Sequence, residues 1–506
     1  MELFLSLLIL IVLTLVTYWF ATRHYNYWSK QHVPFLSNPV PVFGHMLPII
    51  TLKKNMSIFS IDAYKKTNAS AIGFYFLQTP GLIVRDPELV KSVLQTHFNS
   101  FHNNGFHLDE KVDPVFSKNP FFATDLIAWK TARTRTGSHL TGKKLRHLFV
   151  IINEVCSKMD NYIDRKIKET NGSLECELKE TFVKYTGEIV ANAALGVQGQ
   201  SFRDEPDQLS FTNAVKLLFA PTLINGIKQA LLFYVPRVGN FLKVSLLEQK
   251  ADSYFRENIR AVLKERTMSN VAPNDYLQFC INSNGEREID SIIADVLIFY
   301  GDVYETSSTT LATLFYFLSQ NKNIQVKLRQ HILDVLKKNN GVVTYELLKD
   351  MNYLDQVIFE TLRYLPPFGT QFKECTKEIT LMGSDGLKFH LKPGDLAFIP
   401  VSALHMDETY WPEPETFDPD RFSPENVASR HRFVYLAFGE GPRMCIGIRL
   451  GMMLVKIAAV NLLIKYSVEN SEKTRRPLEY DPASLMMYIK GGLWGRFERL
   501  NPNENH

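Results

Sequence analysis

The segment Phe438-Gly439-Glu440-Gly441-Pro442-Arg443-Met444-Cys445-Ile446-Gly447 decides the fold, and an apolar run from Ile448 to Tyr466 follows it. Its glycines let the backbone approach a flat or bulky group closely, and the apolar run has helical spacing. Cys445 is therefore predicted at the start of a helix, where free N–H groups and the helix dipole favour a thiolate. Because an isolated cysteine in such a place is usually a small buried hydrophobe, the functional interpretation depends on the ten-residue context.

This context resembles the haem-binding loop of the cytochrome P450 family, F-x-x-G-x-R-x-C-x-G, with every fixed position filled. The resemblance implies that Cys445 is the thiolate ligand of the iron of haem b, and that Phe438 and Arg443 contact the cofactor. It also implies a mainly α fold with a smaller β region, preceded by a single N-terminal transmembrane helix.

A long helix is predicted from Asp290 to Gln320, and three of its residues are candidate catalytic groups. Glu305-Thr306 resembles the family's oxygen-activation motif, which implies that the Thr306 hydroxyl holds water beside the haem and that Glu305 links it to bulk protons. Mid-helix threonines otherwise bond back to a carbonyl. Asp302 and Val303 stand where the family prefers small residues, and a carboxylate there must find a cation, a proton or hydrogen bonds.

Three further residues are candidate haem contacts. Trp129 and Arg133 lie four apart on one helix face, a spacing that often only packs a cation on an indole. In the family this pair donates to a haem propionate, and Lys373 stands where the family usually carries an arginine with that role. A lysine supplies the charge but not the bidentate fork.

The pair Glu360 and Arg363 is worth little in isolation, because an acid and an arginine three apart occur in many helices. Together with Arg421 it matches the family's Glu-Arg-Arg network, which pins the region leading to the cysteine loop. The β region is expected to include strands at 71–76 and 81–85 and a hairpin over 379–390.

Composition fits one large globular domain of 506 residues, which is the usual size in the family. A net charge of +4 gives no argument for nucleic acid. The five cysteines are odd in number and contain no C-x-x-C pair, which indicates a reducing compartment.

An uncharged apolar run from Leu3 to Thr22 is long enough to cross a bilayer as a helix. The alternative, a cleaved signal peptide, fits less well because no basic residue precedes the run. We expect residues 1–28 to be a single-pass anchor in the endoplasmic reticulum membrane, with the catalytic domain, residues 29–506, on the cytoplasmic side. The apolar segment Lys216–Val244 is expected to contact membrane lipid or to cover a cavity, with a plain core helix pair as the alternative.

The function predicted from the resemblance is a monooxygenase that inserts one atom of O2 into a lipophilic small molecule: a xenobiotic, steroid, terpenoid or fatty acid. Electrons would come from NADPH through a flavoprotein reductase. This partner must be a separate protein because no G-x-G-x-x-G follows a strand here, and cytochrome b5 is a second candidate donor. The chain looks most like insect xenobiotic-metabolising members. The alternatives are a haem-thiolate isomerase or dehydratase, and a haem-binding sensor or carrier without turnover.

Overall fold

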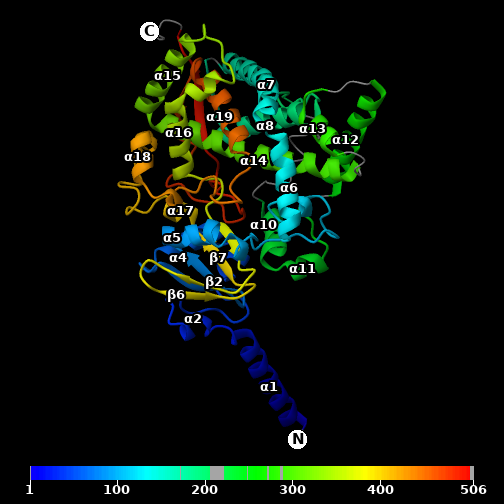
Figure 1. The fold of residues 1–506 in the computed structure, drawn as a ribbon, viewed down its shortest axis with the longest axis vertical. Coiled ribbons are helices and arrows are strands. Elements are labelled where there is room, and N and C mark those ends of the chain that lie inside the picture. Colours follow the sequence, from blue (N-terminus) through cyan, green and yellow to red (C-terminus); the bar gives the residue numbers. More distant parts are fainter. Residues whose placement is uncertain are drawn as a thin grey trace. The chain divides into compact units, whose positions relative to one another are not determined.

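The computed structural model describes residues 2–170, 172–204, 222–247, 249–269, 273–284 and 289–501 (Figure 1). The chain forms two compact units. The strand unit consists of Met1–His107, Phe368–Trp411 and His431–Met444. The helical unit consists of Leu108–Pro367, Pro412–Arg430 and Cys445–His506. Helices predominate over strands among the described residues, which confirms the predicted class.

The strand unit contains a four-stranded sheet in the order β1-β2-β7-β4 and a separate antiparallel hairpin, β5-β6. The strands are β1 (Ala71–Phe76), β2 (Thr79–Val84), β4 (Gln371–Glu374), β5 (Ile379–Met382), β6 (Lys388–Leu391) and β7 (Leu396–Ile399). β1 and β2 are antiparallel, whereas β2 and β7 are parallel, so the N-terminal strands pair with a strand more than 300 residues later. The predicted strands and hairpin are confirmed.

Short helices surround these strands, and only the first is long. The helices of the strand unit are α1 (Glu2–Thr22), α2 (Tyr27–Lys30), α3 (Leu47–Ile50), α4 (Met56–Tyr64), α5 (Pro87–Lys91), η1 (Ser92–Thr96), η2 (Phe98–Ser100), α17 (Val401–Leu404) and η7 (Arg432–Val434). The carboxylate of Asp86 caps α5 by accepting from the Glu88 N–H at 3.0 Å.

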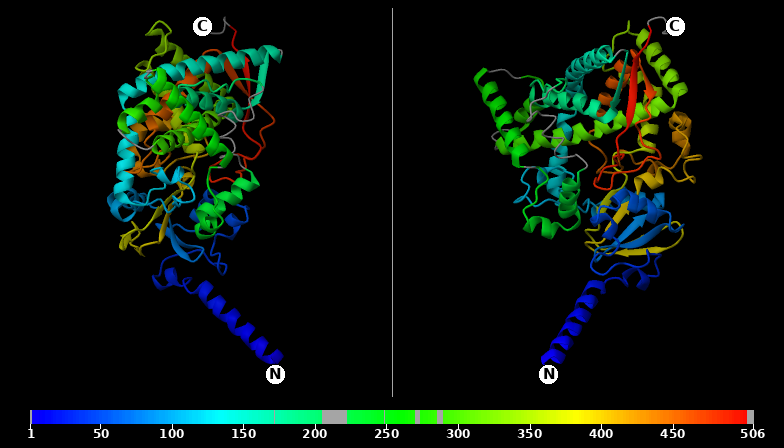
Figure 2. Two further views of the ribbon diagram at one scale, coloured as in Figure 1. Left: turned by 90° about the vertical axis from the view of Figure 1, so that its right-hand side faces the viewer. Right: turned by 180° about the vertical axis from the view of Figure 1, so that it is seen from behind.

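The helical unit surrounds one long helix, α14 (Ile289–Gln320), as predicted. The other helices are η3 (Phe116–Lys118), α6 (Leu126–His139), α7 (Gly142–Glu169), α8 (Leu178–Leu195), α10 (Leu223–Gln229), η4 (Ala230–Tyr234), α11 (Pro236–Phe241), α12 (Gln249–Ser269), α13 (Tyr276–Asn284), α15 (Lys322–Lys337), η5 (Leu347–Asp350), α16 (Asn352–Tyr364), η6 (Pro419–Phe422), α18 (Pro424–Ser429) and α19 (Ile448–Leu463). α14 packs against α8, α13, α16 and α19, and Figure 2 shows it running through this unit.

A three-stranded sheet completes the helical unit, with β3 (Ser173–Glu177), β9 (Trp494–Arg499) and β8 (Tyr466–Asn470) in that order. The apolar run from Ile448 to Tyr466 is helical as far as Leu463, where α19 ends, and Tyr466 begins β8. In β8 the buried Tyr466 and Val468 alternate with partly exposed residues, which is a strand period and not a helical one.

α1 is apolar and its side chains are exposed in this structure, as expected for a helix that would cross a bilayer. It leads away from the strands of its own unit (Figure 2). The helix ends at Thr22, six residues before Trp28, which is fully buried. The predicted anchor boundary at residue 28 stays a prediction, and the contacts described next favour a boundary nearer Thr22.

Three aromatic residues that follow α1 form hydrogen bonds with other parts of the strand unit. The Tyr25 hydroxyl lies 2.9 Å from the Val40 carbonyl, and the Tyr27 hydroxyl lies 2.7 Å from Asp395 Oδ2. The indole N–H of Trp28 donates to a carbonyl of β1 at 3.0 Å. Because these bonds follow α1 within six residues, the chain immediately after α1 is bonded to the strand unit.

We expect Trp28→Ala to lower the free energy of unfolding by about 3–5 kcal/mol, because it empties a fully buried site. Gly73→Ala should also destabilise the protein, since a Cβ there would lie 2.5 Å from Cγ of the Trp28 indole. Chemical unfolding of the full-length protein in detergent, followed by circular dichroism, measures both losses. Trp19→Ala is the matched control on α1, at a side chain that is 64% exposed. An equal loss for Trp19→Ala would contradict this account.

Candidate functional site

The cysteine loop ends where α19 begins, as predicted, with Cys445 three residues before Ile448. Gly441 has φ +75°, and a Cβ on it would lie 2.1 Å from the carbonyl oxygen of Leu94, so only glycine fits there. Phe438 and Arg443, which precede the cysteine, are half-buried and belong to the strand unit. Cys445 itself belongs to the helical unit, and its surroundings there can be described directly.

The Cys445 thiol is accessible to solvent, yet protein surrounds it closely. Burial raises the pKa of the thiol, and the backbone N–H groups of Gly447 and Ile448 oppose this by lowering it. Two charges act on the same sulfur: Asp302 raises its pKa and Arg133 lowers it. Because the thiol is accessible to solvent, it can bind a further group, unlike a cysteine packed in the core.

Asp302 on α14 has the same combination of properties. Its side chain is accessible to solvent, yet protein surrounds it closely enough that burial raises the pKa of its carboxyl to about 7. The side-chain amide of Asn119, which follows η3, donates to Asp302 Oδ1 at 3.3 Å and favours the charged form. The predicted need for a hydrogen-bonding partner is met by this amide.

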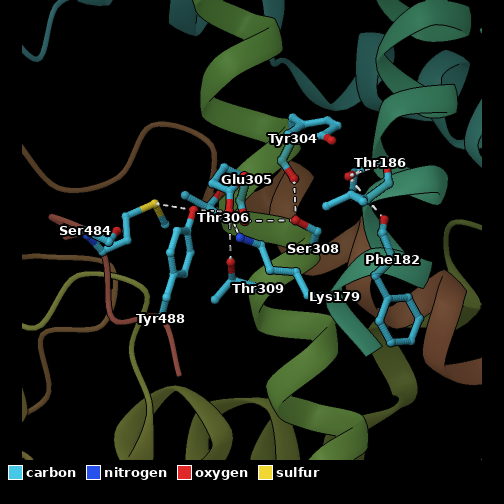
Figure 3. A network of polar contacts seen from close by, with 12 residues as sticks. Lys179, Phe182, Thr186, Tyr304, Glu305, Thr306, Ser308, Thr309, Ser484 and Tyr488 are labelled. Carbon is cyan, nitrogen blue, oxygen red and sulfur yellow. Dashed lines mark hydrogen bonds and ion pairs between the residues drawn. The ribbon is translucent and has the colours of Figure 1, made fainter. Parts of the chain in front are cut away.

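Glu305, one turn later on α14, lies in a different environment (Figure 3). Its side chain is 3% exposed, and its Oε1 pairs with the ammonium of Lys179 at the start of α8. The Tyr488 hydroxyl donates to the same oxygen, and the Thr309 hydroxyl lies 3.5 Å from it. Glu305 is therefore a paired, buried carboxylate, and its predicted role in proton transfer stays a prediction.

Thr306 is half-buried, and its hydroxyl donates to the Asp302 carbonyl at 2.6 Å. This is the back-bonding that mid-helix threonines commonly adopt. It leaves the lone pairs of the hydroxyl oxygen able to accept from water or from a neighbouring donor. The structure thus brings Thr306 and Asp302 into direct contact through side chain and backbone.

The candidate propionate contacts fall in both units. Trp129 is buried and Arg133 half-buried on α6 of the helical unit. Burial lowers the pKa of Arg133 and Cys445 raises it, so this guanidinium is close enough to act on the thiol. Lys373 lies on β4 of the strand unit, where it is buried and donates to the side-chain oxygen of Asn104 at 2.6 Å.

The predicted network of Glu360, Arg363 and Arg421 is present within the helical unit. Arg363 donates to both oxygens of Glu360, at 2.7 and 2.8 Å, and both side chains are fully buried. Arg421 Nε lies 3.6 Å from Glu360 Oε1, and the Arg363 guanidinium also donates to the Pro414 carbonyl at 2.8 Å. This bidentate pair therefore fixes the segment after residue 412 to α16.

Sequence reasoning missed Lys179, Tyr488 and Asn119. Each contacts a carboxylate of α14 from more than 120 residues away, so no local spacing could have found it. The available signal was indirect: a glutamate in an apolar helix requires a cation and donors from elsewhere in the chain.

Comparison with known proteins agrees with these observations. The sequence profile described as Cytochrome P450 matches residues 34–495. Cytochrome P450 6a2 of Drosophila melanogaster is 30% identical, with 98% of this chain and all of that protein covered. Probable cytochrome P450 6g2 of the same species and cytochrome P450 6j1 of Blattella germanica are each 30% identical, over 94% and 97% of this chain and 95% and 97% of those proteins. The chain belongs to the cytochrome P450 family.

Proposed function

We propose that this chain is a membrane-anchored haem-thiolate monooxygenase that oxidises lipophilic small molecules with electrons from a separate NADPH-dependent flavoprotein reductase. The observation that carries the proposal is the Cys445 thiol, accessible yet enclosed, at the N-terminus of α19 and within electrostatic reach of α14. Haem b is the cofactor of the family, and its electrons come from NADPH through the reductase.

The residues present fit a haem thiolate. Burial raises the pKa of the free Cys445 thiol, and a metal cation at the sulfur would hold it as thiolate. Arg133 acts on the same sulfur and would carry, with Trp129, a propionate of the group. Lys373, held by Asn104, would supply a further cation, and Phe438 and Arg443 belong to the same proposed set. When bound, the haem supplies O2 binding and electron uptake.

Proton handling is proposed for Thr306 and Asp302. The Thr306 hydroxyl is fixed by the Asp302 carbonyl and would orient a water through its lone pairs. The carboxyl of Asp302, with a pKa near neutrality, exchanges a proton at physiological pH. It faces the Cys445 thiol and the phenol of Tyr276 on α13, and both groups respond to its charge.

Aromatic residues beside Asp302 support a lipophilic substrate. Asn119, which bonds to Asp302, is followed by Phe121 and Phe122. Phe121 is 41% exposed, and Phe122 stacks on Phe233 of η4 at 5.9 Å. Apolar rings in this position favour xenobiotics, steroids, terpenoids or fatty acids over polar metabolites.

The membrane and partner surfaces belong to the same proposal. Of the segment Lys216–Val244, residues 216–221 lie outside the described residues. The rest forms α10, η4 and α11, on which Leu223, Ile224 and Phe241 are 67%, 69% and 84% exposed. With α1, they would give two contacts with the endoplasmic reticulum membrane, the catalytic part being cytoplasmic.

The basic surface near α6 is proposed to receive the reductase, with cytochrome b5 as a second donor. Lys130 and Lys143 are exposed there. Arg135 and Arg146 instead pair with Asp295 and Glu346, each at 2.7 Å. Because these two arginines are already paired, they add little to the positive charge that an acidic partner would meet.

The ligation proposal predicts the optical spectrum of the reduced carbon monoxide complex. Wild-type protein should show the red-shifted Soret band of thiolate ligation, and Cys445→Ala should lose it. Cys176→Ala, a matched change on β3, should keep it. Product formation with reductase, NADPH and lipophilic substrates then separates a monooxygenase from the isomerase and sensor alternatives. A folded wild-type protein with the spectrum of histidine ligation would refute the assignment.

The raised pKa of Asp302 predicts a pH-dependent stability. An aspartate in the unfolded chain titrates near 3.9, so the folded state holds this proton more tightly. The stability that Asp302 confers should therefore fall as pH rises from about 4 to about 7 and stay constant above. In thermal unfolding, the melting temperature of Asp302→Asn should rise relative to that of wild type as the pH rises across this range.

Asn119→Ala provides the second variant of this test, because it removes the amide that favours the charged form. The pH dependence should then extend to higher pH than in wild type. If the difference in melting temperature between Asp302→Asn and wild type is the same at all pH values, Asp302 does not titrate as described.

A further inference from the structure

The Glu305 contacts join three segments that are far apart in the sequence (Figure 3). Lys179 is the second residue of α8, Glu305 lies in the middle of α14, and Tyr488 lies in the irregular segment before β9. Both the ammonium and the phenol hydroxyl approach one carboxylate oxygen, Oε1. Substitution of Lys179 or Tyr488 should destabilise the protein, because the buried carboxylate would lose part of the compensation of its charge.

The same three residues also contact one another directly. The Lys179 ammonium lies 3.4 Å from the centroid of the Tyr488 ring, so the ring binds the cation that pairs with Glu305. The Tyr488 hydroxyl lies 3.6 Å from Sδ of Met486. Burial, followed by the Glu305 charge, raises the pKa of Tyr488 far above its usual value, which keeps the phenol a donor.

Besides the nearby Asp481 N–H, which donates to the Tyr488 carbonyl at 2.8 Å, two backbone N–H groups attach the segment Ser484–Tyr488 to more distant described residues. The Leu485 N–H donates to the side chain of Gln229, at the end of α10, at 2.9 Å. The Met487 N–H donates to the Pro367 carbonyl at 3.0 Å. Both bonds are between neutral groups, so the bond from Tyr488 to the Glu305 carboxylate is the strong attachment of this segment.

We propose that Lys179, Glu305 and Tyr488 form a buried tie that holds the segment Ser484–Tyr488 against α14, and that Glu305 and Lys179 are positioning residues for it. Glu305 then serves to fix this segment beside Thr306 and does not relay protons. If the proposed function holds, the tie also sets the space that is available to a bulky substrate next to Thr306.

Two substitutions of Glu305 separate the tie from a proton relay. Glu305→Gln cannot exchange a carboxyl proton but keeps an oxygen that accepts from Tyr488, whereas Glu305→Ala removes the acceptor. The tie predicts that Gln loosens Ser484–Tyr488 less than Ala does, because Gln keeps a neutral acceptor for Tyr488. A relay predicts that the two variants are equally impaired.

Amide hydrogen exchange of the holoenzyme, read on the peptide that contains residues 484–490, measures the tie without turnover. Tyr488→Phe and Glu305→Ala should speed this exchange roughly tenfold or more, and Glu305→Gln, which keeps a neutral acceptor but loses the charge, should speed it less than Glu305→Ala does. Tyr480→Phe is the matched control, since Tyr480 bridges to Ile489 on the same turn. Unchanged exchange in Tyr488→Phe would overturn the proposal, even if the monooxygenase assignment holds.

Ligand titrations followed at the Soret band show whether the tie positions the segment Ser484–Tyr488 for ligand binding or only stabilises the fold. Imidazole and N-dodecylimidazole share one iron-binding group and differ only in the alkyl chain. Tyr488→Phe and Lys179→Met should raise the Kd of the dodecyl compound roughly threefold to tenfold and leave that of imidazole unchanged, and Lys179→Arg should restore it. Equal changes for both probes, or no rescue by arginine, would overturn the positioning role.

Discussion

A carboxylate removed from water must be paired with a cation, accept hydrogen bonds or keep its proton, and α14 carries two carboxylates that meet this constraint in opposite ways. Glu305 is 3% exposed and is paired with Lys179 and Tyr488. Asp302, almost one turn earlier, has one amide donor and a carboxyl pKa of about 7. One helix therefore presents a carboxylate paired with Lys179 and Tyr488 to the C-terminal segment and a carboxyl with a raised pKa near the Cys445 thiol.

The ionisation of the Cys445 thiol depends on the same balance between burial and hydrogen bonding. Burial raises its pKa more than the Gly447 and Ile448 N–H groups lower it, so the loop provides an enclosed position for a thiolate but needs a bound cation to keep it ionised. A second buried charge network, Glu360 with Arg363, fixes the segment after residue 412. Paired buried charges thus fix two segments that lie far apart in the sequence, whereas Asp302, bonded to the Asn119 amide, has a carboxyl pKa near neutrality.

The sequence was sufficient for features set by local pattern or by a resemblance to known motifs. α14, the helix with Trp129 and Arg133, the strands at 71–76 and 79–84 and the Glu360 network were all predictable in this way. The environments of Glu305 and Asp302 were not predictable, since their partners lie in distant segments of the chain.

The division of roles on α14 is tested most directly by infrared spectroscopy of the holoenzyme, which detects the carbonyl stretch of a protonated carboxyl group. Difference spectra between wild type and each variant should assign a band that titrates near pH 7 to Asp302: it should vanish in Asp302→Asn and persist in Glu305→Gln. Loss of the band in Glu305→Gln and its retention in Asp302→Asn would contradict the account.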